Sequence, residues 1–209
     1  MKLSALPLIV GLLMAGNSHG QLPVELLAGN DRTTADMLWF RPFTDSAGKA
    51  SRFLFFNRSR ASVNYSNQTA FGTTLAVSYN LRSGIGFVFA GQFLNQGFYP
   101  KAGVQFFTRS AHAMLFTWVT AELLQESRVD WFLLSRWEPP LSHTLNLFAQ
   151  LELLSVLDPH GTWSFTQRIR LGLGFPLRWQ AGAGFDLGQV GKETFTTSSN
   201  VGVFIRKEF

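Results

Sequence analysis

The chain lacks cysteine altogether and contains few charged residues. None of its 209 residues is Cys, which excludes a disulfide scaffold, a thiolate metal site and a cysteine nucleophile. Only 15% of the residues are charged, well below the roughly 25% of an average soluble domain. The 21 Phe and 6 Trp argue against disorder. The 18 Lys and Arg exceed the 13 Asp and Glu but form no basic run, so no nucleic-acid partner is predicted.

Long apolar runs are scarce as well. The mean hydropathy of +0.09 is too low for a bundle of transmembrane helices, each of which needs about 20 apolar residues. At the N-terminus, an apolar segment (Leu3–Ala15) follows Lys2 and precedes the small residues Ser18 and Gly20. This segment is short for a membrane anchor and is typical of a secretory signal peptide. We therefore expect residues 1–20 to be cleaved off.

The rest of the sequence alternates between apolar residues and small or polar residues with a period of two. In a strand, successive side chains point to opposite faces, so such a segment has one apolar face and one polar face. In the segment 69–81 the apolar positions are Phe71, Leu75, Val77, Tyr79 and Leu81. Similar alternation recurs over 144–153, 163–171, 179–187 and 200–209.

A soluble β-sandwich would also alternate, but three features favour a transmembrane barrel. The segments are long enough to cross a bilayer at a tilt, which takes about 9–11 residues. The polar face carries several charges, which a dry sandwich core does not tolerate but the interior of a barrel does. Aromatic residues lie near the expected strand ends, where interfacial girdles form: Trp39, Phe98, Tyr99, Trp137, Trp163 and Trp179.

The sequence thus predicts an all-β fold, an antiparallel up-and-down barrel that forms a single domain over residues 21–209. Ten strands begin at about Arg52, Thr69, Ile85, Lys101, His112, Arg128, Ser142, Trp163, Leu177 and Ser198. A further hairpin, built from 22–30 and 33–43, raises the total to twelve, which we favour. In the ten-strand alternative, 21–49 is a periplasmic tail or a plug. Both even totals place both termini in the periplasm.

The connections between these strands differ in expected length. Reading back from a periplasmic C-terminus, we expect long outside loops at 155–162 and 188–198. Tight periplasmic turns are expected at 139–141 and 174–176. Such alternation is the usual arrangement of outer-membrane barrels.

The C-terminus carries a resemblance to a known class. Phe209 is the last residue and follows Val201, Val203 and Ile205 at alternate positions, although Lys207 interrupts the apolar series. This segment resembles the C-terminal assembly signal of bacterial outer-membrane β-barrels. The resemblance implies an outer-membrane location and recognition by the barrel assembly machinery. We expect the faces rich in Phe, Leu and Val to contact outer-membrane lipid.

A second resemblance concerns the order of segments. The aromatic block Phe53–Tyr65 follows two short strand-like segments and precedes repeated alternating strands. This layout is similar to that of the small, twelve-stranded channels of the nucleoside-channel type. No nucleoside-site residue can be carried over from it.

Polar residues at inward positions form the candidate site. The residues expected to line the lumen are Arg58, Arg60, Asp130, Arg136, Gln150, Glu152, Arg168, Arg170 and Asp186. Because ringed charges set the selectivity of pores, they predict a narrow channel or binding barrel for small polar or anionic solutes. The alternative is a non-catalytic structural or partner-subunit barrel, in which salt bridges plug the lumen because buried charges need partners.

A lipid-modifying hydrolase is a third, weaker hypothesis. His160 could act as a base in an outside loop, with Ser164 as nucleophile and Asp158 orienting the His. The spacing is no family signature, so we assign no catalytic residue.

Metal and cofactor sites are not predicted. His112 and His143 have no suitably spaced second ligand, which argues against a metal site. Gly182 and Gly184 alternate within a strand and precede no helix, which argues against a dinucleotide cofactor. Small inward residues instead leave room for a bulky Arg or a ligand.

Overall fold

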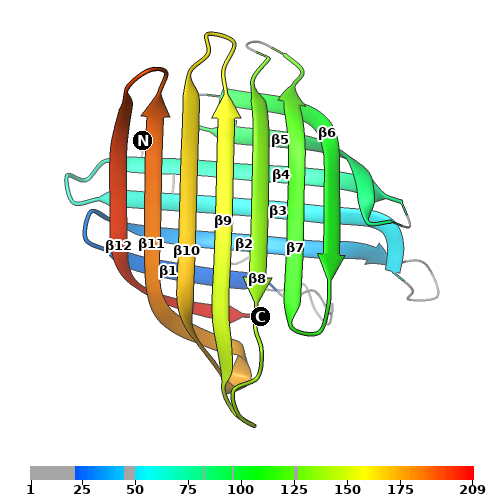
Figure 1. The fold of residues 1–209 in the computed structure, drawn as a ribbon, viewed down its shortest axis with the longest axis vertical. Coiled ribbons are helices and arrows are strands. Elements are labelled where there is room, and N and C mark those ends of the chain that lie inside the picture. Colours follow the sequence, from blue (N-terminus) through cyan, green and yellow to red (C-terminus); the bar gives the residue numbers. More distant parts are fainter. Residues whose placement is uncertain (1–21, 45–49, 82, 96, 125–126) are drawn as a thin grey trace, which may run out of the picture.

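The computed structural model describes residues 22–44, 50–81, 83–95, 97–124 and 127–209, and these residues form a closed antiparallel barrel (Figure 1). The expected signal peptide, 1–20, lies outside the described residues. A short 3-10 turn, η1 (Pro176–Arg178), is also present. Within the described ranges the twelve strands are β1 (Pro23–Gly29), β2 (Arg32–Thr44), β3 (Ala50–Asn64), β4 (Thr69–Asn80), β5 (Ile85–Leu94), β6 (Gly97–Arg109), β7 (Ala113–Glu122), β8 (Val129–Trp137), β9 (Asn146–Leu157), β10 (Trp163–Phe175), β11 (Trp179–Gly191) and β12 (Phe195–Glu208).

The prediction of twelve strands is confirmed, and the ten-strand alternative is wrong. Residues 22–44 form no tail or plug: β1 pairs with β2 on one side and with β12 on the other. Leu26, for example, is opposite Ala35 in β2 and Ile205 in β12. The pairing of β1 with β12 closes the sheet, so no strand edge is left with unsatisfied backbone groups. No helix in the described ranges is long and apolar enough to cross a membrane.

The barrel is flattened into two walls that cross each other. In Figure 1, β7–β11 run vertically in front, and β1–β5 run horizontally behind them. Strands of a closed barrel tilt by about 35–45° from its axis, so opposite walls cross steeply. At one strand junction, between β10 and β11, an added Cβ on Gly182 would lie 2.4 Å from the Cα of Gly172. Glycine therefore permits the close backbone approach there.

The outward face is apolar, as the alternation predicts. In β5, Phe89 is 67% exposed, whereas the adjacent Val88 is buried at 1%. In β12, Val201, Val203 and Ile205 are exposed and Phe204 is buried. A continuous apolar outer surface on a closed sheet is stable in lipid rather than in water.

Part of the interior differs from the prediction. The sequence led us to expect polar or small inward residues and a Phe-rich outer coat, but part of the lumen is filled by apolar side chains. In this aromatic core, the rings of Phe56 and Phe116 stack with centroids 5.5 Å apart, and Trp118 meets Phe56 edge-on at 5.0 Å. Closely spaced walls need such filling to avoid voids. The aromatic core consists of Leu38, Phe56, Ala76, Val88, Ala90, Met114, Phe116, Trp118, Phe132 and Leu134, with Phe40, Phe107 and Leu154 packed against it.

The connections also differ from the prediction. We call the end of the barrel that holds residues 22 and 209 the terminal end, and the opposite end the far end. At the far end, β9 and β10 are joined by 158–162 alone, and β11 and β12 by 192–194. The expected long loops at this end are wrong, because β9 continues to Leu157, β11 continues to Gly191 and β12 begins at Phe195. The longer segment 138–145 lies instead at the terminal end, between β8 and β9.

The expected aromatic girdles are present only in part. Trp137, Trp163 and Trp179 are exposed at strand ends, as expected. Tyr99, in contrast, is buried, and Trp39 lies in the middle of β2.

Candidate functional site inside the barrel

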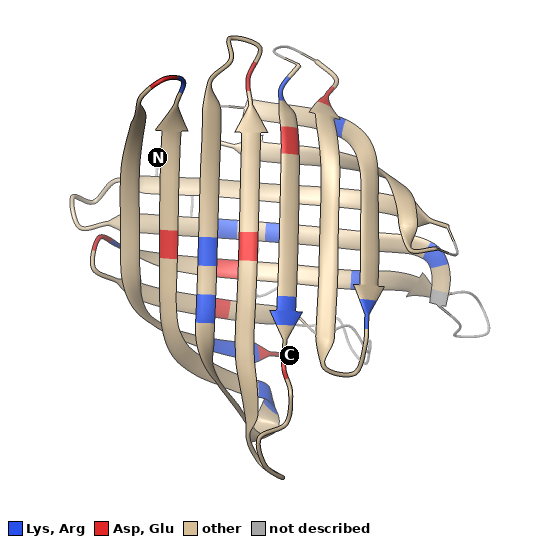
Figure 2. Cartoon of the chain, in the orientation of Figure 1, with Lys and Arg blue, Asp and Glu red and all other residues tan. Residues whose placement is uncertain are grey.

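Five charged residues meet where the two walls overlap (Figure 2). Arg58 in β3 contacts carboxylates on both walls: its Nη2 lies 2.5 Å from Asp36 Oδ2 in β2, and its Nη1 lies 2.5 Å from Glu152 Oε2 in β9. Arg60 also pairs with Asp36, and Arg168 in β10 pairs with Glu152. We call Asp36, Arg58, Arg60, Glu152 and Arg168 the central cluster.

The central cluster has more positive than negative charge. Three guanidinium groups share the carboxylates of Asp36 and Glu152. Glu152 is 1% exposed, so its charge depends on these partners rather than on water. Arg168 Nε is buried and has no hydrogen-bond acceptor among the described residues. Within the cluster the guanidinium groups thus exceed the carboxylates by one, and Asp186, opposite Arg168 on β11, is a nearby third carboxylate.

A second group of charges, the terminal-end cluster, lies closer to the chain termini. Arg170 Nε donates to Glu25 Oε1 at 2.8 Å, and its Nη1 donates to Asp186 Oδ1 at 2.7 Å. Gly184 leaves room for Leu27 and Arg170, because a Cβ there would lie 2.6 Å from Leu27 Cδ1 and 3.2 Å from Arg170 Cδ. The cluster comprises Glu25, Arg136, Gln150, Arg170, Asp186, Arg206 and Glu208.

Gln150 joins two arginines of the terminal-end cluster. Its Oε1 accepts hydrogen bonds from Arg136 Nε at 3.2 Å and Arg206 Nη1 at 3.0 Å. Arg136 also pairs with Glu208 at 3.1 Å. The three carboxylates of this cluster match its three guanidinium groups, so it carries no positive excess.

All of the sequence-predicted lumen residues are buried or partly buried, but they do not form one site. The structure places Arg58, Arg60, Glu152 and Arg168 in the central cluster and Arg136, Gln150, Arg170 and Asp186 in the terminal-end cluster. Asp130 lies apart from both and pairs with Lys101.

Sequence reasoning missed three of the ionic partners: Glu25, Asp36 and Lys101. Each is buried at an inward position of its strand. For Asp36 the signal was present in the alternation of β2, where the even positions Thr34, Asp36 and Leu38 are all buried.

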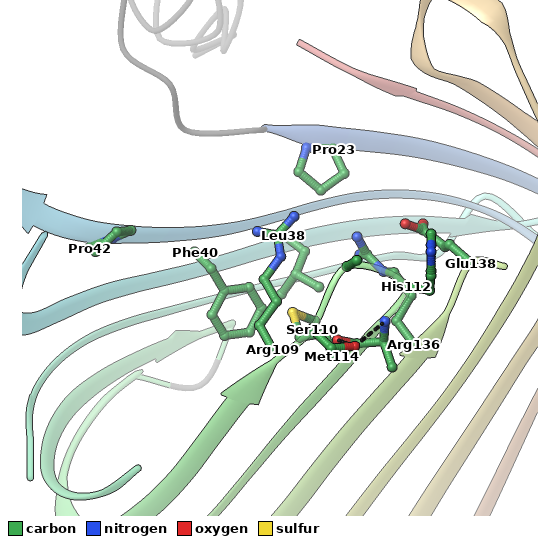
Figure 3. A pocket seen from close by; sticks show the side chains of 12 residues that line it. Pro23, Leu38, Phe40, Pro42, Arg109, Ser110, His112, Met114, Arg136 and Glu138 are labelled. Carbon is green, nitrogen blue, oxygen red and sulfur yellow. Dashed lines mark hydrogen bonds between the residues drawn. The ribbon is translucent and has the colours of Figure 1, made fainter. Parts of the chain in front are cut away.

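Cavities border both clusters. At the far end, a polar cavity of about 460 Å³ and an aromatic cavity of about 260 Å³ both reach Arg60 and Arg168. At the terminal end, a cavity of about 180 Å³ is lined by Arg136 and Glu138 (Figure 3). Leu38 lines the latter cavity, so the aromatic core lies between the two ends of the lumen.

Of the proposed hydrolase residues, Asp158 and His160 lie in an ordinary turn, and Ser164 lies in β10. Asp158 Oδ1 accepts hydrogen bonds from the backbone N–H groups of Thr162 at 2.8 Å and His160 at 2.9 Å. These bonds, that from Thr162 first, hold the pKa of Asp158 below its ordinary value. The side chain of Asp158 thus caps the backbone of the 158–162 turn and does not orient the imidazole of His160. Within the described ranges no cluster of three or more metal-ligating side chains occurs.

Comparisons with known proteins identify the fold but no family. No family model matches the chain, and no curated protein matches it. A solved structure of the KdgM porin in complex with disordered oligogalacturonate is similar, with a TM-score of 0.53 and 10% identity, over 90% of this chain and 99% of that chain. A second structure of the KdgM porin has a TM-score of 0.50 and 11% identity, over the same shares of the two chains. The chain therefore has the fold of an outer-membrane β-barrel of the porin kind.

Proposed function

We propose that this porin-fold barrel is a narrow channel or binding barrel for small polar or anionic solutes. The observation that carries the proposal is the positive excess of the central cluster, where Arg58, Arg60 and Arg168 share two carboxylates. Arg60 and Arg168 also line both far-end cavities. Charges that line a pore at close quarters set its ion selectivity.

The proposal includes an orientation in the membrane. Both termini lie in the periplasm and the far end faces the outside, after removal of the signal peptide. The outward residues Val201, Val203, Ile205 and Phe209 contact lipid and serve as the signal for the barrel assembly machinery. The exposed apolar face of β12 supports this placement.

One structural neighbour, the KdgM porin, was solved with an acidic ligand. The KdgM porin was solved with oligogalacturonate, whose sugar units carry carboxylates. For this chain, that complex supports anionic solutes in general and does not name one. The resemblance to nucleoside-type channels stays a hypothesis.

Ion selectivity in planar bilayers tests the proposal. The wild type should conduct with a preference for anions, and Arg60→Gln plus Arg168→Gln should reverse the preference, since one arginine would then face two carboxylates. Arg52→Gln is the matched control, because Arg52 is exposed and lines neither far-end cavity. Absence of both conductance and anion binding in the wild type would refute the proposal.

A plugged structural or partner-subunit barrel is the second candidate. The Arg58–Glu152 bridge and the aromatic core favour it, because both occupy the lumen. This alternative requires every buried charge to be paired and predicts no conductance. The Arg168 guanidinium is paired with Glu152, but its Nε has no acceptor among the described residues, so the hydrogen bonding of such a plug would be incomplete.

A further inference from the structure

The two far-end cavities share one set of lining residues. Arg60, Ser62, Ala70 and Arg168 line both the polar cavity and the aromatic cavity. A ligand whose anionic group lies between Arg60 and Arg168 could therefore extend into either chamber. The chemistry of each chamber decides which kind of ligand fits.

The aromatic cavity is lined in part by aromatic and other apolar side chains. Phe56, Trp118, Phe132 and Leu154 line it, and all four belong to or pack against the aromatic core. Its volume of about 260 Å³ is below the roughly 300–1,000 Å³ of pockets for drug-sized ligands. It therefore suits a single small ring, which would gain by offset or edge-to-face contact with these aromatic side chains.

Two buried donors near this cavity lack acceptors. Trp118 is 7% exposed, and its Nε1 has no hydrogen-bond acceptor among the described residues. Arg168 Nε is orphaned in the same way. Asp130 and Glu152 also line this cavity, and each has one carboxylate oxygen that accepts no hydrogen bond among the described residues, so unpaired donors and acceptors both occur around it. The charge of the lining favours an anion, because two carboxylates stand against four cationic side chains: Arg58, Arg60, Lys101 and Arg168.

We propose that the aromatic cavity binds an aryl carboxylate, with the carboxylate on Arg60 and Arg168 and the ring against Trp118 and Phe56. One carboxylate would neutralise the positive excess of the central cluster. A planar carboxylate also matches the fork of donors on a guanidinium group. This inference rests on the proposed function and deepens it by naming the solute class.

The carboxylate and the ring can be tested separately on the purified, full-length barrel in detergent. Isothermal titration would compare benzoate with benzamide, which lacks the charge, and with glucuronate, which has the charge on a hydroxylated ring. We expect benzoate to bind at least tenfold more tightly than either. Equal or tighter binding of glucuronate, or of benzamide, would overturn the inference.

Variants then locate the site. Arg60→Gln plus Arg168→Gln should weaken benzoate binding at least tenfold, and Trp118→Leu should weaken benzoate more than glucuronate. Trp131→Leu is the matched control, because Trp131 is an exposed residue that does not line the cavity. Heat-modifiable gel migration shows whether each variant is folded. If a variant does not fold, the comparison of benzoate, benzamide and glucuronate on the wild type still tests the aryl-carboxylate site.

The outcomes separate this inference from the proposed function. If the barrel conducts anions selectively but binds benzoate no more tightly than benzamide and glucuronate, the aryl-carboxylate site is refuted and the proposed channel function stands. Neither conductance nor binding of any anion would refute both.

Discussion

Arg58 and Glu152 join opposite walls of the barrel, with Arg58 Nη1 2.5 Å from Glu152 Oε2. The two residues are far apart in sequence and belong to β3 and β9, which are not neighbours in the sheet. Unlike a salt bridge between adjacent strands, this one spans the lumen, so it constrains both the shape of the barrel and the route that a solute could take.

Glu152→Gln should therefore destabilise the barrel. The substitution leaves Arg58 and Arg168 short of a buried counter-charge, and breaking such a pair costs about 3–5 kcal/mol. The free energy of unfolding, from urea titration in detergent micelles, measures the effect. Asp31→Asn is the control: its pair with Arg32 is exposed, so a change of about 0–1 kcal/mol is expected. Equal changes in the two variants would contradict a special role for the bridge.

The aromatic core should be more sensitive to truncation than the outer face. Phe116 is 0% exposed, and Phe116→Ala should lower the free energy of unfolding by about 3–5 kcal/mol through the cavity it leaves. Phe89→Ala removes the same ring from an outward position and should cost clearly less. The same urea titration measures both variants. A larger loss of unfolding free energy for Phe89→Ala than for Phe116→Ala would contradict a main stabilising role of the aromatic core.

If the outward face contacts lipid, the cost of placing a charged residue there should depend on its depth in the membrane. Val203 is 68% exposed in the middle of β12, and Val203→Arg should cost about 2–4 kcal/mol in a bilayer. Phe195→Arg, at the far end of the same strand, should cost about 0–1 kcal/mol. Folding titrations into lipid vesicles would compare them. Equal costs would indicate that this face does not cross the hydrocarbon layer.

The C-terminal residue offers a test of assembly apart from stability. Phe209 exchanges backbone hydrogen bonds with Leu22, and both N···O distances are 3.1 Å. Phe209→Ala keeps these bonds and removes only the exposed ring. We expect less heat-modifiable barrel in cell envelopes, yet unchanged folding of the purified protein into micelles. A parallel loss in both measurements would assign the ring a structural role instead of a signal.

The sequence by itself determined the alternation of outward and inward positions along the strands. Side chains alternate strictly in a strand, so Val201, Val203 and Ile205 could be placed outward and Arg168 and Arg170 inward. The same alternation predicted the strand number, because each bilayer crossing needs its own alternating segment. Phe56 shares the inward parity of Arg58, but the general expectation that Phe-rich faces contact lipid did not identify it as part of the interior.

Only the tertiary structure decided which inward residues meet. Closure and tilt set which strands face each other across the lumen, and neither is encoded in a local pattern. Arg58 therefore pairs with Glu152, and Lys101 pairs with Asp130. These partners are too far apart in the sequence for any local spacing pattern to predict the pairing. The filling of part of the lumen by the aromatic core has the same cause: where the two walls approach, inward side chains must pack, and Phe and Trp fill that space.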